Sequence, residues 1–363
     1  MPEVTQKSRD DIQKILEIGK VDVGNGTLFG ASTKRKASTN KLTLVISTGG
    51  SGLTAIQEAI NSADQTLNPT YRQFVKFLVI DSDEDAIKGA AQPGITIQYI
   101  SLAGANKRFL RENRSPFFKN FMPADYNVSK INPNGASQDR MTGKLKLYDV
   151  DDMGTNDFII AQKIQNLFSG DWLPYANLNI DIMILTGISG GNGSGTFMDL
   201  AAIARKACHD AAVTGTVTVY GYIMLPDTAD RFASSAASKK TLYRNGYAAL
   251  KELESYMSQS FMPKRVLKVD RPDPSASITM DITTPLLDFP VLISGNYDDA
   301  VSMIAETIVN MIADNGGTFT QSSFYSNITT ARPIAFSTAE VSYNGVLKPY
   351  ACPEDSHMYC AIG

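Results

Sequence analysis

Apolar residues along the chain gather in short continuous runs, which alternate with stretches of helical spacing. The runs have the length of strands and lie at residues 42–47, 74–81, 95–101, 179–187, 216–225 and 290–294. Apolar residues recur every three or four positions in residues 55–63, 158–168, 197–204, 243–257 and 298–311. Buried strands that alternate with amphipathic helices predict an α/β fold, a doubly wound parallel sheet with helices on both faces.

Two of these strands lead directly into glycine-rich loops, and each loop precedes a helix. The first loop, TGGSG, spans residues 48–52, and the second, SGGNGSG, spans residues 189–195. Glycines let backbone amides approach phosphate oxygens, and the start of a helix adds partial positive charge. Because loops that follow parallel strands meet at one edge of the sheet, the two loops predict a phosphate site there. The alternative is that the glycines only allow tight packing of a helix on the sheet.

The first loop alone supports a second hypothesis. Gly50-Ser51-Gly52-Leu53-Thr54-Ala55 fits the dinucleotide fingerprint G-x-G-x-x-A, and Asp81 would then accept from a ribose hydroxyl. This pattern suggests a nicotinamide-dependent oxidoreductase. Asp81 follows Gly50 by 31 residues, where about 20 is usual, and the hypothesis leaves SGGNGSG unexplained. No G-x-x-x-x-G-K-[ST] sequence occurs, which excludes a P-loop ATPase.

Composition and charge narrow the class of protein further. The 363 residues include 34 Lys and Arg against 37 Asp and Glu, so the net charge of −3 predicts no direct binding of nucleic acid. Three cysteines are too few for a disulfide framework, which favours a reducing compartment and a cytoplasmic location. No apolar run approaches the roughly 18 residues of a transmembrane segment. Because the P-loop lysine is absent, phosphates would be held mostly by backbone amides, helix dipoles and a metal ion.

The second loop resembles the signature of the tubulin/FtsZ superfamily, [SAG]-G-G-T-G-[SAT]-G after the fourth strand. Ser189–Gly195 matches at six of seven positions, and Asn192 replaces the usual Thr. The resemblance covers residues 42–315. It implies a cytoskeletal protein that binds GTP or GDP with Mg²⁺ and self-assembles head to tail into filaments.

The resemblance also implies the residues of a nucleotide site. Asp81 and Asp83 would approach Mg²⁺, directly or through water. The phosphate contacts would come from three glycine-containing loops, at Gly49, Gly50, Ser51, Gly52, Gly104, Ala105, Asn106, Gly190, Gly191, Asn192, Gly193, Ser194 and Gly195. The ribose and base would meet Thr54, Asp227, Arg231, Tyr297 and Asp298. In this arrangement Tyr297 stacks on the base and Asp298 accepts from guanine, whereas the alternatives are a core aromatic and a helix-capping acid.

Hydrolysis in this superfamily is completed by a loop of the neighbouring subunit, and this loop departs from the usual pattern here. The sequence at residues 313–327 lacks N-x-D-F-A-D, and its only acid is Asp314. Either Asp314 acts in catalysis, or the polar residues Gln321 and Ser322 orient water weakly, or hydrolysis is slow. The sequence therefore leaves open an assembly-activated GTPase and a GTP-bound scaffold that does not hydrolyse.

The expected domain organisation has three parts. Residues 1–40 form an N-terminal arm, residues 41–315 a GTP-binding domain with its central helix, and residues 316–363 the start of a second domain. A domain of typical size would need about 100 further residues, so we expect the chain to be a piece of a longer protein. The polar, irregular insertion at residues 106–150, with its Gln138-x-Arg140-x-x-Gly143 run, resembles divergent bacterial tubulin-like proteins more than ordinary FtsZ or tubulin.

Overall fold

The computed structural model describes part of the chain, and the ranges that follow are those for which structure is given. They are residues 34–90, 95–100, 126–127, 131–132, 134–148, 150–151, 154–257, 266–269, 278–281, 286–313, 340–343, 346–349 and 360–362. Contacts divide the chain into two units, Met1–Arg35 and Lys36–Gly363. The description below concerns the second unit.

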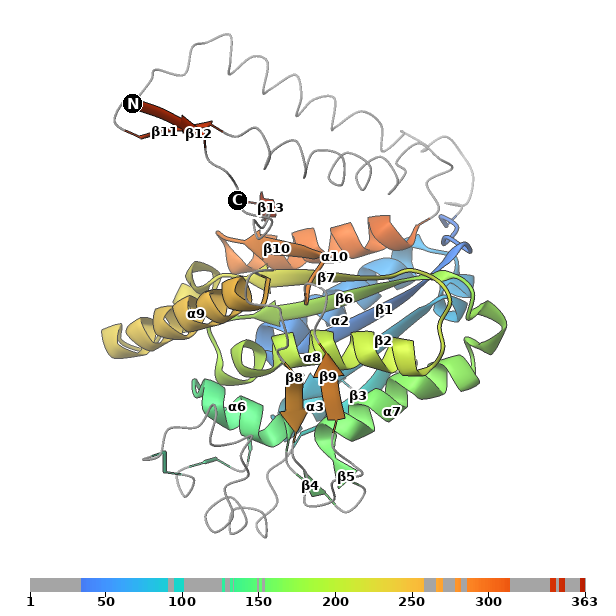
Figure 1. Ribbon diagram of the computed structural model, residues 1–363, viewed down its shortest axis with the longest axis horizontal. Coiled ribbons are helices and arrows are strands. Elements are labelled where there is room, and N and C mark those ends of the chain that lie inside the picture. Colours follow the sequence, from blue (N-terminus) through green and yellow to red (C-terminus); the bar gives the residue numbers. More distant parts are fainter. Residues whose placement is uncertain are drawn as a thin grey trace. The chain divides into compact units, whose positions relative to one another are not determined.

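One parallel sheet organises this unit (Figure 1). Among the described residues it contains seven strands in the order β13-β10-β7-β6-β1-β2-β3, and each neighbouring pair is parallel. The strands are β1 (Lys41–Thr48), β2 (Val75–Asp81), β3 (Ile95–Tyr99), β6 (Asn179–Gly187), β7 (Val217–Met224), β10 (Phe289–Ile293) and β13 (Cys360–Ile362). The chain builds outward from β1 in one direction and then from β6 in the other. The strand order therefore reverses between β1 and β6, the place where ligands bind in such sheets.

Helices cover both faces of the sheet, which confirms the doubly wound α/β fold (Figure 1). One apolar cluster includes residues of α2 and α10, and the other includes residues of α6, α7, α8 and α9. The helices are α2 (Gly49–Thr66), α3 (Glu84–Ala90), α6 (Arg140–Leu147), α7 (Asn156–Ser169), α8 (Gly191–Asp210), α9 (Ala236–Met257) and α10 (Tyr297–Ile312). Short 3-10 helices are η1 (Pro69–Gln73), η3 (Leu173–Tyr175) and η4 (Pro226–Phe232). No helix in these described ranges is long and apolar enough to cross a membrane.

Smaller pairs of strands lie outside the main sheet. They are antiparallel and consist of β4 (Val150–Asp151) with β5 (Gly154–Thr155), β8 (Val266–Val269) with β9 (Ile278–Asp281), and β11 (Glu340–Tyr343) with β12 (Val346–Pro349).

The expectation of an irregular insertion at residues 106–150 was wrong for its last part, where α6 forms. The Asp139 side chain caps this helix by accepting a hydrogen bond from the Met141 amide at 3.0 Å. The helix packs on α8, where Lys144 forms an ion pair of 2.8 Å with the buried carboxylate of Asp199. Polar residues that are buried by long-range partners break the apolar pattern, which is why the sequence did not indicate a helix.

A side-chain cap fixes the start of α10. The Asn296 side chain accepts hydrogen bonds from the amides of Asp298 at 2.8 Å and Asp299 at 3.4 Å. We expect Asn296→Ala to lower the free energy of unfolding by about 1 kcal/mol, because two amides of the first turn lose their acceptor. Urea denaturation measures this change. Asn296→Ser, which keeps a capping oxygen, should recover most of the loss, and equal stability of the Ala variant and the wild type would contradict the assignment.

Candidate functional site

The two glycine-rich loops lie side by side where the strand order reverses. Thr48 at the end of β1 is in register with Thr186 near the end of β6. The Thr48 and Thr196 hydroxyls are hydrogen-bonded at 2.7 Å, and the Asn192 side-chain amide donates to the Thr48 hydroxyl at 3.4 Å. The first loop is therefore joined directly to the first turns of α8.

The helices α2 and α8, which follow β1 and β6, have no side-chain caps. The Thr48 side chain accepts no hydrogen bond from α2, and Gly190, which precedes α8, has no side chain with which to cap that helix. The helices α6 and α10, by contrast, are capped by Asp139 and Asn296. Helix starts have unpaired amides and partial positive charge, which together favour an anion. Two uncapped starts at one edge indicate an anion site.

Most of the loop glycines are required by close packing. A methyl group on Gly193 would lie 2.6 Å from the Gly187 carbonyl oxygen, and one on Gly191 would lie 2.6 Å from that of Asp139. A methyl group on Gly52 would be 3.1 Å from the Leu185 carbonyl carbon. The alternative noted from the sequence, tight helix packing, thus accounts for these glycines. Gly49 adopts a φ of +75°, which favours glycine for a separate reason.

Two glycines have no such packing requirement. A methyl group on Gly50 or on Gly190 would meet no atom within 4 Å. Both lie at the uncapped helix starts, and Gly190 has φ −82° and ψ 172°, which any residue can adopt. These two positions are therefore the best candidates for a close approach of a ligand to the backbone.

Three hydroxyls of these loops and of the helices that follow them have partners within the protein. The Ser194 hydroxyl donates to the Gly190 carbonyl oxygen. The Thr54 hydroxyl donates to the Gly50 carbonyl oxygen at 3.1 Å, and the Thr196 hydroxyl donates to that of Asn192 at 2.8 Å. Backbone amides and the Ser189 hydroxyl, which has no partner among the described residues, thus remain as donors of these loops.

Several buried polar atoms at the same edge have no hydrogen-bond partner within the described ranges. They belong to the ends of β1, β2 and β6 and the start of α8, and are Oγ of Ser47, Ser82 and Ser189 and Oδ1 of Asn192. An unpaired buried polar atom costs about 1–3 kcal/mol, so such atoms are rare and usually meet a ligand or an ordered water. Their concentration here indicates that this edge binds a polar ligand.

The acidic loop after β2 holds its carboxylates by backbone amides. Asp81 is buried, and its Oδ1 accepts from the amides of Ser82 at 2.6 Å and Asp83 at 3.0 Å. Burial raises the pKa of Asp81, while these amides and the nearby Lys146 ammonium oppose that rise. Asp83 Oδ1 in turn accepts from the amides of Asp85 and Ala86 at 3.0 and 3.1 Å.

These two carboxylates were predicted to approach a metal ion. Among the described residues, no three His, Cys, Asp or Glu side chains form a metal-binding group. Mg²⁺ often takes one or two carboxylates and completes its shell with phosphates and water. Asp81 and Asp83 remain candidates for a Mg²⁺ site of this kind, in which the bound phosphates supply part of the coordination shell.

The predicted base and ribose residues are paired with one another. Arg231 holds Asp298 through two hydrogen bonds of 2.6 and 2.8 Å, and this contact lowers the pKa of Asp298. The Arg231 guanidinium lies 4.4 Å from the Tyr297 ring centre, and the exposed Phe232 ring meets Tyr297 edge-on at 5.0 Å. Asp227 accepts from the Ser294 hydroxyl at 2.5 Å and the Gly295 amide at 2.8 Å. A base could stack on the buried Tyr297 only after Arg231 and Phe232 move.

Some predicted residues lie outside the described ranges. They are Gly104, Ala105 and Asn106 of the third loop and the catalytic candidates Asp314 and Gln321. Their roles stay predictions.

The sequence missed one group of residues at this edge, because their contacts are long-range. Arg140 donates to the Ser194 carbonyl oxygen at 3.0 Å, and Asn245 of α9 donates to that of Ser189 at 2.9 Å. Two features of the sequence could have indicated these contacts. One is the run from Gln138 to Gly143, to which no site role was given, and the other is the polar residue Asn245 on the buried side of α9.

Comparison of the chain with models of known protein families places it in one family. A family model described as "Tubulin like" matches residues 44–363. The chain therefore belongs to the tubulin-like family, within the tubulin/FtsZ superfamily, as the signature loop predicted. No curated protein matches the chain.

Solved structures of this superfamily are similar to the chain at low identity. CetZ2 from Haloferax volcanii, solved as a GTPγS-bound protofilament, is 14% identical with a TM-score of 0.44, over 80% of this chain and 63% of that one. The empty FtsZ dimer from M. jannaschii is 13% identical with a TM-score of 0.40, over 90% and 64%. The TubZ of Clostridium botulinum phage c-st is 10% identical with a TM-score of 0.37, over 74% and 58%. The chain spans less than two thirds of each of these proteins.

Proposed function

We propose that this protein binds GTP at the edge between β1 and β6 and self-assembles head to tail into filaments, with slow GTP hydrolysis at the subunit interface. The observation that carries GTP binding is the pair of uncapped helix starts beside four unpaired buried polar atoms, in a member of the tubulin-like family. Nucleotide at the interface would couple assembly to its phosphate state.

The phosphates would lie against the starts of α2 and α8. The backbones at Gly50 and Gly190 leave room for a close approach. First-turn amides of α8 other than that of Gly191, which donates to the Ser137 carbonyl oxygen, would donate to phosphate oxygens. Gly49, Ser51, Gly104, Ala105 and Asn106 are proposed to complete the phosphate site. Bound Mg²⁺ would neutralise phosphate charge, with Asp81 or Asp83 as its protein ligand.

The base would lie at the start of α10. We infer that Tyr297 stacks on guanine and that Asp298 accepts from the guanine N1–H and N2–H groups once Arg231 releases it. Adenine offers no such pair of donors, so a carboxylate there favours GTP over ATP. Asp227 is held at the end of β10 and would face the ribose.

Assembly would complete the catalytic site with residues of a neighbouring subunit. Asp314 or Gln321 would orient the attacking water, which demands positioning more than a strong base. A head-to-tail contact is open and yields polymers rather than closed dimers.

We further propose a cytoplasmic location and a nucleotide domain that spans residues 41–315.

The oxidoreductase hypothesis loses its structural support. Gly52 packs against β6, which does not match the role of the second glycine in the dinucleotide fingerprint, where the backbone approaches the pyrophosphate.

Light scattering at 90° tests the assembly part of the proposal. We expect GTP with Mg²⁺ to produce a rise in scattering above a threshold protein concentration, with phosphate release measured in parallel. GDP and ATP serve as controls and should give little scattering. GTP that stays bound without scattering or phosphate release would instead identify a scaffold of the same fold.

A further inference from the structure

We propose that Arg140 is a positioning residue for the phosphate site, which ties the first turn of α8 to α9 and so couples GTP affinity to the position of α9. This inference rests on the proposed function, because it concerns the same site. Arg140 lies in the insertion and outside the tubulin/FtsZ signature loop.

The Arg140 side chain contacts two elements at once. Its Nε and Nη2 donate to the Ser194 carbonyl oxygen at 3.3 and 3.0 Å. Its Nη1 and Nη2 donate to the two carboxylate oxygens of Glu252 on α9 at 3.0 and 2.6 Å. The planar guanidinium makes both contacts in one geometry, which a lysine ammonium cannot reproduce. Ser194 belongs to the turn whose amides would hold phosphate.

The backbone around Arg140 is pressed against the same turn. The Gly191 amide donates to the Ser137 carbonyl oxygen at 3.0 Å, and a methyl group on Gly195 would lie 3.2 Å from the Arg140 carbonyl carbon. Ser137 has a φ of +51°, which residues other than glycine adopt rarely and which tends to occur at ligand sites and switch regions. Several independent contacts therefore fix this segment against the glycine loop.

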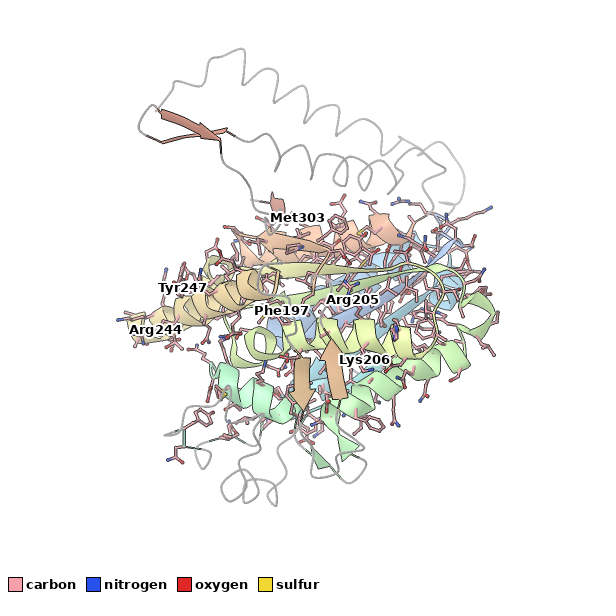
Figure 2. All side chains as sticks on the ribbon, in the orientation of Figure 1. Phe197, Arg205, Lys206, Arg244, Tyr247 and Met303 are labelled. Carbon is pink, nitrogen blue, oxygen red and sulfur yellow. The ribbon has the colours of Figure 1, made fainter. Side chains whose placement is uncertain are left out.

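A second bridge connects α9 to the same place. The Asn245 side chain donates to the carbonyl oxygens of Gln138 at 2.8 Å and Ser189 at 2.9 Å. The exposed face of α9 carries Tyr243 and Tyr247, and Figure 2 shows Tyr247 and Arg244 on the outer part of this helix. A displacement of α9 would thus reach the glycine loop at two points. Asn245 would transmit it to Ser189, before α8, and Arg140 would transmit it to Ser194, in the first turn of α8.

The experiment compares GTP dissociation constants of four variants and one control variant by equilibrium binding. We expect Arg140→Ala to raise the constant about tenfold, since a charged hydrogen bond to the loop is lost. Arg140→Lys should recover part of the affinity. Glu252→Ala should weaken binding in the same direction, and the double variant should be no weaker than Arg140→Ala, because both changes break one connection. Arg72→Ala is the matched control, since Arg72 pairs with Asp64 at 2.7 and 2.9 Å away from this loop.

Hydrogen exchange of the amides at residues 192–195 in the nucleotide-free chain provides the readout that separates positioning from mere stability. We expect faster exchange there in Arg140→Ala and Glu252→Ala, with unchanged exchange in β1 and β6. Wild-type affinity and exchange in both variants would overturn the role of Arg140 and leave the proposed function intact. If the wild type bound no GTP, the proposed function would fail, and unchanged exchange in the variants would overturn the positioning role separately.

Discussion

Gly190→Val is expected to abolish GTP retention and to leave the folded chain as stable as the wild type. The backbone at Gly190 is extended, and a side chain there meets no protein atom within 4 Å, so the fold tolerates it. The same side chain would fill the space through which a phosphate approaches the uncapped start of α8. We expect the GTP dissociation constant to rise at least ~100-fold, which corresponds to about 2.7 kcal/mol.

Equilibrium binding and urea denaturation of the same samples measure the two effects. Gly89→Val is the matched control, because Gly89 on α3 is also surrounded by open space. That variant should bind GTP like the wild type. Normal GTP binding by Gly190→Val would show that phosphate does not approach the backbone at this residue.

Gly52→Ala has the opposite expected effect, a loss of stability of about 3 kcal/mol. The added methyl group would lie 3.1 Å from the Leu185 carbonyl carbon and closer still to its oxygen. Leu185 lies in β6, which is paired with β1 on one side and with β7 on the other. The two buried neighbouring strands keep the backbone of Leu185 from moving away from the added methyl group. Denaturation of the nucleotide-free chain measures the loss without any contribution from a ligand.

Gly50→Ala provides the comparison from within the same loop. Gly50 lies two residues before Gly52, and a methyl group there meets no atom within 4 Å. We expect this variant to keep its stability and to bind GTP more weakly. Equal destabilisation by both substitutions would contradict the division of the loop into packed and open glycines.

The central strands and α10 could be predicted because their environment is uniform. Residues 42–47 and 179–187 were expected as buried strands, and the structure places strands at Lys41–Thr48 and Asn179–Gly187. A strand covered on both faces is apolar at nearly every position, which leaves little ambiguity. The helix expected at residues 298–311 extends over Tyr297–Ile312 for a similar reason, since one face is apolar throughout.

The glycine loops were recognised from the sequence, but the separate roles of their glycines were not. Gly190 and Gly191 are neighbours with the same residue type, yet one meets open space and the other meets the backbone of Asp139. Only the three-dimensional position of the segment before α6 distinguishes them. The contact of Arg140 with Glu252 joins residues 112 positions apart, which no local pattern reveals.

The predicted base-side residues illustrate a different difficulty. Residue types at the start of α10 suggested contacts with guanine, and the structure shows Arg231 and Asp298 paired with each other. A sequence pattern indicates which chemical groups are present at an edge of the sheet. It does not indicate whether those groups pair within the protein before a ligand enters.

Identification of the bound nucleotide is the most direct test of GTP binding by this chain. The purified protein is denatured, and the released small molecules are separated by chromatography and compared with GTP, GDP, ATP and NAD. GTP or GDP in amounts close to that of the protein is the expected result, with neither present in Gly190→Val. Release of NAD, or a wild-type chain that neither carries nor takes up GTP in the presence of Mg²⁺, would contradict the proposed site and function.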